Sequence, residues 1–251
     1  MVPYWMSRTE LLLGEEKVTQ LMGKNVLVVG LGGVGGICAE MIARSGIGKM
    51  TIVDADVVDL SNCNRQIPAL HSTAGQPKAE VLAQRLLDIN PALELTVKKI
   101  YIKEEITREL LDSGQFDYAV DCIDTLSSKV FFIRSCVEKK IPIVSSLGAG
   151  GKIDPSRVMV TDISKTYECN LAKYVRKRLK TLGIRGGVKV VFSAEPVDQG
   201  RIIVTEKAFP KKSLIGTISY MPAVFGCVAA SVVIRELMGE EVVLANTIKT
   251  D

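Results

Sequence analysis

Residues 25–36, NVLVVGLGGVGG, decide the fold. The first five form an uninterrupted apolar run, which is typical of a strand buried inside a parallel sheet. Gly30, Gly32, Gly33 and Gly35 follow with the spacing G-x-G-x-x-G, and a helical pattern begins near residue 35. Glycines let the backbone turn tightly and approach phosphate groups, while the start of a helix offers N–H groups and positive potential. The stretch therefore predicts a nucleotide-binding turn between a strand and a helix.

The same alternation of strand and helix patterns continues from residue 25 to about residue 150. It predicts an α/β, Rossmann-like core over residues 25–150, with a mostly parallel sheet and helices on both faces. A short amphipathic helix over residues 8–23 is expected to lead into the first strand. The expected strands cover residues 25–29, 49–53, 93–100, 118–122 and 141–145, and the expected helices cover residues 35–45, 78–90, 104–111 and 129–139.

Residues 151–251 have a different pattern and are expected to extend the core with a mixed sheet. Short strands are predicted at residues 158–162, 188–192 and 202–205, with a basic helical stretch between them. A helix over residues 219–236, with Pro222 near its first turn, closes the chain. We see no linker and no internal repeat, so we predict one continuous domain over residues 1–251.

The composition is that of a globular protein. Of the 251 residues, 47% are hydrophobic, and the net charge of +4 does not by itself indicate an anionic partner. The six cysteines form no C-x-x-C pair, so a zinc site is not expected. The longest apolar run, residues 221–234, is short for a membrane span and predicts a buried helix. The N-terminus lacks a signal-peptide pattern, and we expect a cytoplasmic protein without a membrane segment.

Polar residues after the second expected strand favour ATP over NAD. Asp54 ends that strand and fits an acidic residue that binds a ribose hydroxyl, which both nucleotides carry. Arg65 in SNCNRQ (61–66) and Lys78 in QPK (76–78) then add two cations, which suit a triphosphate attacked at its α-phosphate. The residues alone therefore predict that Gly30, Gly32, Gly33, Gly35, Asp54, Arg65 and Lys78 bind the nucleotide.

These motifs, with GQPKAE (75–80) and DCID (121–124), resemble the ubiquitin-activating-type superfamily of adenylating enzymes. The resemblance implies that Asp54 holds the ribose, that Asn62, Arg65 and Lys78 hold the phosphates, and that Asp124 lies by Mg²⁺ and the α-phosphate. It aligns Arg8 with an arginine that reaches the triphosphate of the other subunit in a homodimer. The resemblance therefore implies a catalytic set of Arg65, Lys78, Asp124 and Arg8, with ATP, Mg²⁺ and a monovalent cation, K⁺ or Na⁺, near the nucleotide. It adds Asp56, Asn62, Gln66 and Asp124 to the expected nucleotide-binding residues.

Within that superfamily the second half of the chain resembles the tRNA threonylcarbamoyladenosine dehydratases. The resemblance rests on GAGGKIDPS (148–156), VTDISKT (160–166), a basic stretch and VFSAEP (191–196). It implies ATP-dependent cyclisation of the threonyl carboxylate through an acyl-adenylate, with net loss of water. Two alternatives stay open: adenylation of a ubiquitin-like sulfur carrier, whose activators usually have paired zinc cysteines, and an NAD-dependent oxidoreductase. A sulfur-relay protein also stays open as a partner.

The basic segment from Lys165 to Lys189 is expected to contact the tRNA backbone. It holds eight cations against one acid, Glu168. Its helical spacing predicts that Lys173, Arg176, Lys177 and Lys180 project away from the protein. Cys169 stands where some members of the superfamily form a thioester, but a structural role is the preferred interpretation. His71, the one histidine, is expected to be a structural or surface residue.

Overall fold

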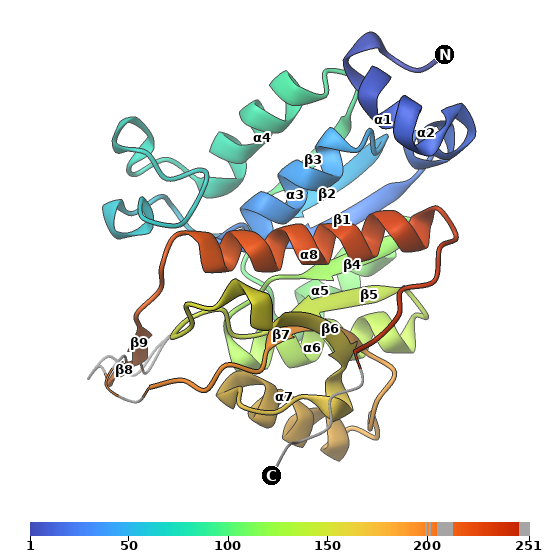
Figure 1. Cartoon of the computed structure of the whole chain (residues 1–251). Helices are drawn as coiled ribbons and strands as arrows, with labels where there is room; N and C mark the ends of the chain where they lie inside the picture. Colours follow the sequence, from blue (N-terminus) through green and yellow to red (C-terminus); the bar gives the residue numbers. More distant parts are fainter. Residues whose placement is uncertain (199, 201, 205–212, 246–251) are drawn as a thin grey trace.

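The computed structural model describes residues 1–198, 200, 202–204 and 213–245. Its centre is a seven-stranded sheet with the order β3-β2-β1-β4-β5-β7-β6 (Figure 1). The strands of this sheet are β1 (Asn25–Val29), β2 (Lys49–Val53), β3 (Glu94–Lys98), β4 (Tyr118–Asp121), β5 (Ile143–Ser146), β6 (Val158–Asp162) and β7 (Lys189–Ser193). The predicted α/β fold with a mostly parallel sheet is confirmed.

The strands from β3 to β7 run parallel, and the edge strand β6 runs antiparallel to β7. The chain moves outward from β1 to β2 and β3, then returns to the other side of β1 with β4. This reversal creates a switch point between β1 and β4, where open α/β sheets bind ligands beyond the carboxyl ends of their strands. Figure 1 draws these carboxyl ends on the left.

Two layers of helices enclose the sheet, because alternate residues of a strand point to opposite faces. Val26 and Val28 of β1 lie in the core beneath one layer, whereas Leu27 and Val29 lie in the core beneath the other. The first layer contains α3 (Gly35–Arg44), α4 (Lys78–Ile89) and α8 (Tyr220–Leu237). The second contains α5 (Glu104–Asp112), α6 (Leu126–Glu138) and α7 (Asn170–Thr181).

The C-terminal helix α8 is the buried helix that the sequence predicts. Its 18 residues have a mean hydropathy of 1.4, so by length and composition it passes the test for a membrane span. Half of it is buried, and Met221, Phe225 and Val233 are completely covered in the core against the sheet. Figure 1 shows α8 lying along the face of the sheet beside α3. This packing identifies it as a core helix.

The structure departs from the expected elements at several places. The expected helix over residues 8–23 is two helices, α1 (Ser7–Leu13) and α2 (Glu15–Met22), because Gly14 between them is not helical (φ 83°, ψ 155°). Helix α6 begins at Leu126, three residues before the prediction, so the loop after β4 is shorter than expected. Short 3-10 helices lie in the connections, at η1 (Tyr4–Met6), η2 (Leu60–Asn62), η3 (His71–Thr73), η4 (Pro155–Arg157) and η5 (Ile163–Lys165).

The third strand expected in the C-terminal portion does not join the main sheet. It forms β8 (Ile202–Val204), which pairs antiparallel with β9 (Ser213–Ile215) in a separate two-stranded sheet. Thr205, the last residue of the expected strand, lies outside the described residues. The mixed character of this portion is confirmed by β6, β7 and this hairpin together.

Candidate active site

The glycine-rich turn joins β1 to α3 at the switch point of the sheet. Gly30 has φ 87°, a conformation that other residues adopt at a cost, and its N–H donates to the Val53 carbonyl at 2.8 Å. A Cβ atom on Gly35 would lie 1.7 Å from the Gly30 carbonyl oxygen, so no side chain fits there. The turn therefore closes on itself and leads the chain directly into α3, whose N-terminus favours a phosphate.

Asp54 ties the second strand to this turn. Its Oδ2 accepts from the Leu31 N–H at 2.6 Å, and its Oδ1 accepts from the Asp56 N–H at 2.8 Å. Burial raises the pKa of the Asp54 carboxyl, and the two N–H groups oppose that effect. The carboxyl group thus lies at the carboxyl end of β2, next to the turn, where an acidic residue can meet a ribose.

The segment with residues 61–66 packs across the glycine-rich turn. A Cβ atom on Gly33 would lie 3.1 Å from the Arg65 carbonyl oxygen, and one on Gly32 would lie 3.7 Å from the Gln66 side-chain nitrogen. The Arg65 guanidinium donates to the Ser61 carbonyl and to Asn64 Oδ1, both at 2.8 Å. Asn62 is buried in the same segment.

Gln66 carries an unusual oxygen. Among the residues that the structure describes, its Oε1 is the one buried side-chain N or O atom without a hydrogen-bond partner. A buried polar atom without a partner is costly, and such atoms in a native site call for an explanation. A polar group of a ligand bound against the turn would supply the missing partner.

Lys78 faces the same region from the start of α4. Its side chain is only 6% exposed, and Nζ lies 3.0 Å from Asp56 Oδ2. The Lys78 N–H also donates to the Asp56 carbonyl at 3.0 Å, so the two loops are held together. A buried ammonium paired with an exposed carboxylate can transfer its contact to a phosphate at little cost in desolvation, because that cost has already been met in folding.

Asp124 follows β4, the strand on the other side of β1. The Cys122 carbonyl oxygen lies 2.8 Å from where a Cβ atom on Gly30 would stand, so the loop with Asp124 abuts the turn. Asp124 is exposed. Its carboxylate at the switch point is an oxygen ligand of the kind that Mg²⁺ takes beside phosphates.

A buried ion pair, which the sequence analysis did not identify, anchors that loop. Asp121 and Lys129 are both fully buried, and Lys129 Nζ lies 2.7 Å from Asp121 Oδ2. Nζ also donates to the Ser146 carbonyl at 2.8 Å, and Asp121 Oδ1 accepts from the Ile123 N–H at 3.0 Å. The pair therefore connects β4, β5 and α6 directly beneath the loop with Asp124. An aspartate that ends an apolar strand, eight residues before a lysine, was the available signal.

Comparison with known proteins identifies the family. The model of the ThiF family matches residues 6–250. The chain belongs to the ThiF family. It is 39% identical over 239 residues to the tRNA threonylcarbamoyladenosine dehydratase of Bacillus subtilis, covering 92% of this chain and 94% of that protein. It is 33% identical over 144 residues to the sulfur carrier protein ThiS adenylyltransferase of Escherichia coli, covering 56% of this chain and 55% of that protein.

Solved structures give the same relationship. The fold matches that of the Escherichia coli tRNA N6-threonylcarbamoyladenosine dehydratase TcdA with a TM-score of 0.84 and 36% identity, over 94% of both chains. The complex of TcdA with ATP matches with a TM-score of 0.83 and 36% identity, over 93% of both chains. The resemblance inferred from the motifs is confirmed, and the dehydratases match over far more of the chain than the sulfur-carrier enzyme does.

Arg8 lies apart from the site in this ThiF-family chain. It is exposed on α1, which adjoins the amino ends of the strands, because Met6 just before it packs against Gly46 ahead of β2. The glycine-rich turn lies at the carboxyl ends of the strands, on the opposite side of the sheet from α1.

His71 is exposed in η3, in agreement with a surface role.

A buried lysine, Lys152, joins two motifs of the second half of the chain, GAGGKIDPS (148–156) and VFSAEP (191–196). Lys152 is 2% exposed, and its ammonium donates to the carbonyls of Ser193 and Glu195 and, at 3.5 Å, of Glu168. The Glu195 carboxylate accepts from the N–H groups of Ile153 and Asp154. Burial lowers the pKa of Lys152. Neither residue was identified as important from the sequence, and together they fix the loop that follows β5.

Helix α7 carries the basic segment, but one of its cations is placed differently from the prediction. Arg176 does not project away: it is half-buried, and its guanidinium donates to the Thr166 carbonyl at 2.6 Å and to the Thr166 hydroxyl. Lys173, Lys177 and Lys180 are exposed, as expected.

Cys169 is buried at the start of α7, where Sγ accepts from the Ala172 N–H at 3.5 Å and caps the helix.

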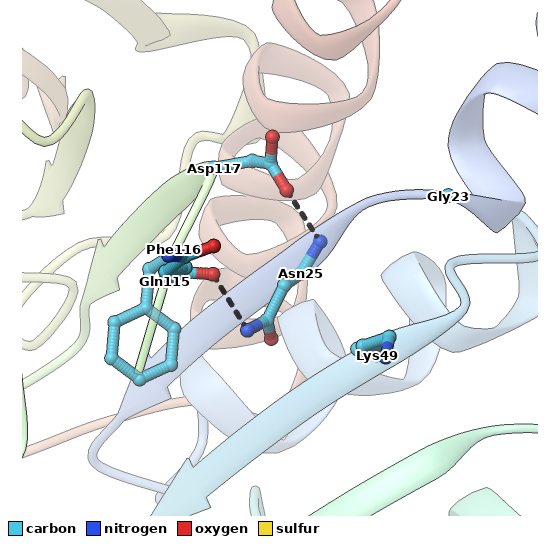
Figure 2. Close-up of a pocket in the computed structure, with 6 residues that line it drawn as sticks. All are labelled: Gly23, Asn25, Lys49, Gln115, Phe116 and Asp117. Atoms are coloured by element: carbon cyan, nitrogen blue, oxygen red, sulfur yellow. Dashed lines mark hydrogen bonds between the residues drawn. The ribbon is translucent and has the colours of Figure 1, made fainter. Parts of the chain in front are cut away.

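A hollow of about 510 Å³ lies at the amino ends of the strands, away from the switch point. Figure 2 shows Asn25 donating its backbone N–H to Asp117 and its side-chain amide to the Gln115 carbonyl, each at 2.8 Å. These bonds hold the loop before β4 against β1. The wall of the hollow is formed by Gly23, Asn25, Lys49, Gln115, Phe116 and Asp117. Its position at the amino edge does not favour a nucleotide, which open α/β sheets bind at the carboxyl edge.

Proposed function

We propose that this chain is an ATP-dependent tRNA threonylcarbamoyladenosine dehydratase. The observation that carries the proposal is the convergence at one switch point of the closed glycine turn, the unpartnered Gln66 oxygen and the buried Lys78. The match to the Bacillus subtilis dehydratase over 92% of the chain supports the choice of substrate. The TcdA structure with ATP supports the choice of nucleotide.

The reaction follows from the chemistry of a carboxylate, whose oxygen is a poor leaving group. An oxygen of the threonyl carboxylate attacks the α-phosphorus of ATP, and pyrophosphate leaves. A nitrogen of the same modification then attacks the acyl carbon, loses its proton and expels AMP, which retains the carboxylate oxygen. The nucleophile is part of the substrate, so ring closure is effectively unimolecular and needs no enzyme thiol.

The residues of the site have defined tasks in this scheme. The start of α3 and Lys78 hold the phosphates, Arg65 neutralises the charge that develops on them, and Asp54 orients the ribose. Asp124 would hold Mg²⁺, which supplies further charge neutralisation when bound. The resemblance adds a monovalent cation, K⁺ or Na⁺, near the nucleotide.

The proposal extends to a homodimer in which Arg8 completes the site of the second copy. Helix α1 and the residues before it present large apolar side chains to solvent, with Tyr4 93% exposed and Leu11 and Leu12 both 81% exposed. A second copy that covered them would bury this apolar surface and bring Arg8 to another chain. A cytoplasmic location and a sulfur-relay protein as a further partner complete the proposal.

The outer face of α7 is proposed to contact the phosphates of the tRNA. Lys173, Lys177 and Lys180 are exposed there. Neutralising phosphates supplies most of the sequence-independent affinity for nucleic acids. Arg176 is left out of this set because its guanidinium is bonded to Thr166.

The decisive experiment incubates the protein with ATP, Mg²⁺ and tRNA that carries the modification, followed by mass spectrometry of the nucleosides. The expected result is a mass loss of one water on the modified nucleoside together with formation of AMP. Omitting ATP is the control, and the product must then be absent. An unchanged nucleoside alongside adenylation of a sulfur-carrier protein would establish the alternative function instead.

A further inference from the structure

A second hollow lies at the start of α7, separate from the glycine-rich turn. It has a volume of about 560 Å³. Three cations, one carboxylate, an aromatic ring and an exposed amide contribute to its wall, which leaves a net positive charge: Lys165, Lys173, Arg176, Glu168, Tyr167 and Asn170. This combination of positive charge and an aromatic ring is the one with which proteins hold single-stranded nucleic acid.

The hollow is close to the nucleotide site although it belongs to the second half of the chain. Gly148 follows β5, and a Cβ atom on it would lie 3.5 Å from Cys169 Sγ in the wall of the hollow. Strand β5 is two places from β1 in the sheet, which separates these two strands by roughly 10 Å at ordinary strand spacing, and the Tyr167 ring packs one strand further on, against Phe192 of β7. Gly148 and the glycine-rich turn both follow the carboxyl ends of parallel strands, so the hollow adjoins the same end of the sheet as the nucleotide site.

The wall of the hollow is held in place from behind. The Tyr167 ring meets Phe192 edge to face, with the ring centres 5.7 Å apart and the planes at 71°. The Arg176 guanidinium donates to the Thr166 carbonyl, and the buried Lys152 ammonium donates to the Glu168 carbonyl on the other side of Tyr167. The ring is thus fixed by contacts on both neighbours in the chain, which lowers the entropic cost of placing a base on it.

We propose that this hollow receives the modified nucleoside after it has turned out of the RNA strand. The proposal rests on the proposed function. A carboxylate attached to a base cannot reach an α-phosphate at the switch point while that base is stacked in its strand, so the nucleoside has to be presented alone. The base lies against Tyr167, as unstacked bases do on aromatic side chains in RNA recognition. Lys165 and Lys173 meet the neighbouring phosphates, and the carboxylate points towards the glycine-rich turn.

The first test compares Tyr167→Ala with Tyr167→Phe in steady-state dehydration of modified tRNA. The unmodified protein is measured first. If it does not dehydrate this tRNA, the proposed function is wrong, and the role of the hollow is not the cause of the failure. With an active parent, Tyr167→Ala should raise the KM for modified tRNA roughly 5- to 150-fold, as expected for the loss of one stacked base. Tyr167→Phe keeps the ring and should retain the parental KM, and neither variant should change the KM for ATP.

A second variant fills the hollow without touching the core. Asn170 is exposed at the first position of α7, so Asn170→Trp adds bulk to the wall with little effect on folding. Its matched control, Leu182→Trp, adds the same ring to an exposed residue beyond the other end of α7. Asn170→Trp should raise the KM for modified tRNA at least tenfold, while its Kd for unmodified tRNA equals that of the parent. Leu182→Trp should have the KM and the Kd of the parent. Parental KM values for both Tyr167→Ala and Asn170→Trp would overturn the assignment of the hollow.

Discussion

Replacing Lys129 by Met should remove the one cation that faces the buried Asp121 carboxylate among the described residues. Both side chains have no exposed surface, and Nζ lies 2.7 Å from Oδ2. Without the ammonium, Asp121 keeps the Ser145 hydroxyl at 2.6 Å and the Ile123 N–H at 3.0 Å. A buried charge left without its partner costs about 3–5 kcal/mol of the free energy of unfolding. For a chain of this size that loss lowers the Tm by roughly 6–20 °C.

The assay is thermal or urea unfolding of the parent, the single variant and the double variant Asp121→Asn with Lys129→Met. The double variant removes both charges, so it should recover most of the stability that the single variant loses. The single variant also loses the bond from the Lys129 ammonium to the Ser146 carbonyl, which ties α6 to β5 beneath the loop with Asp124, so AMP formation should fall in the single variant even below its Tm. The pair does not have the proposed structural role if Lys129→Met lowers the free energy of unfolding by less than about 1 kcal/mol. The same holds if the loss in the double variant equals the sum of the losses in the two single variants, Lys129→Met and Asp121→Asn.

Four other predictions test the proposed active site and its surroundings. Asp124→Ala should fold normally and lose AMP formation, measured by release of AMP from ATP. Mixing Arg8→Ala chains with Asp124→Ala chains should restore partial activity, because one hybrid site keeps both residues; no recovery despite proven subunit exchange contradicts a shared site. Cys169→Ala should keep substantial dehydratase activity at a stability cost of about 1 kcal/mol for the lost cap, whereas activity at background with intact ATP binding would support a thioester. Replacing Lys177 and Lys180 by Glu should raise the KM for tRNA and reduce the salt dependence of binding by about two phosphate contacts, with ATP binding unchanged in calorimetry; parental tRNA binding at several salt concentrations excludes this face.

Local patterns in the sequence were sufficient for the glycine-rich turn and the strands around it. The turn at Gly30 and Gly35 depends on the conformations of a few adjacent residues, and those conformations leave a direct mark on residue type. The alternation of strand and helix patterns likewise predicted the parallel order, since a strand, a helix and a second strand pack together in one hand. Element ends were less certain, as the break at Gly14 and the early start of α6 show.

The positions of charged side chains relative to one another were decided by the tertiary structure. Helical spacing placed Arg176 outside, whereas the chain before α7 brings Thr166 to its guanidinium. For Lys129 the only signal was its place eight residues after an aspartate that ends an apolar strand, and Lys152 had no feature that tied it to Glu195.

The sequence by itself therefore determined the fold class, the nucleotide-binding turn and the family. Those properties depend on short segments whose backbone geometry restricts the residues that can occupy them. The tertiary structure alone decided which cations are buried and which stay exposed, and that a hollow with Tyr167 forms at the start of α7 beside Gly148, at the carboxyl end of β5. The physical reason is that burial and pairing depend on groups contributed by distant parts of the chain. Lys152, for example, meets the Glu195 carbonyl across 43 residues, and no local pattern records such a contact.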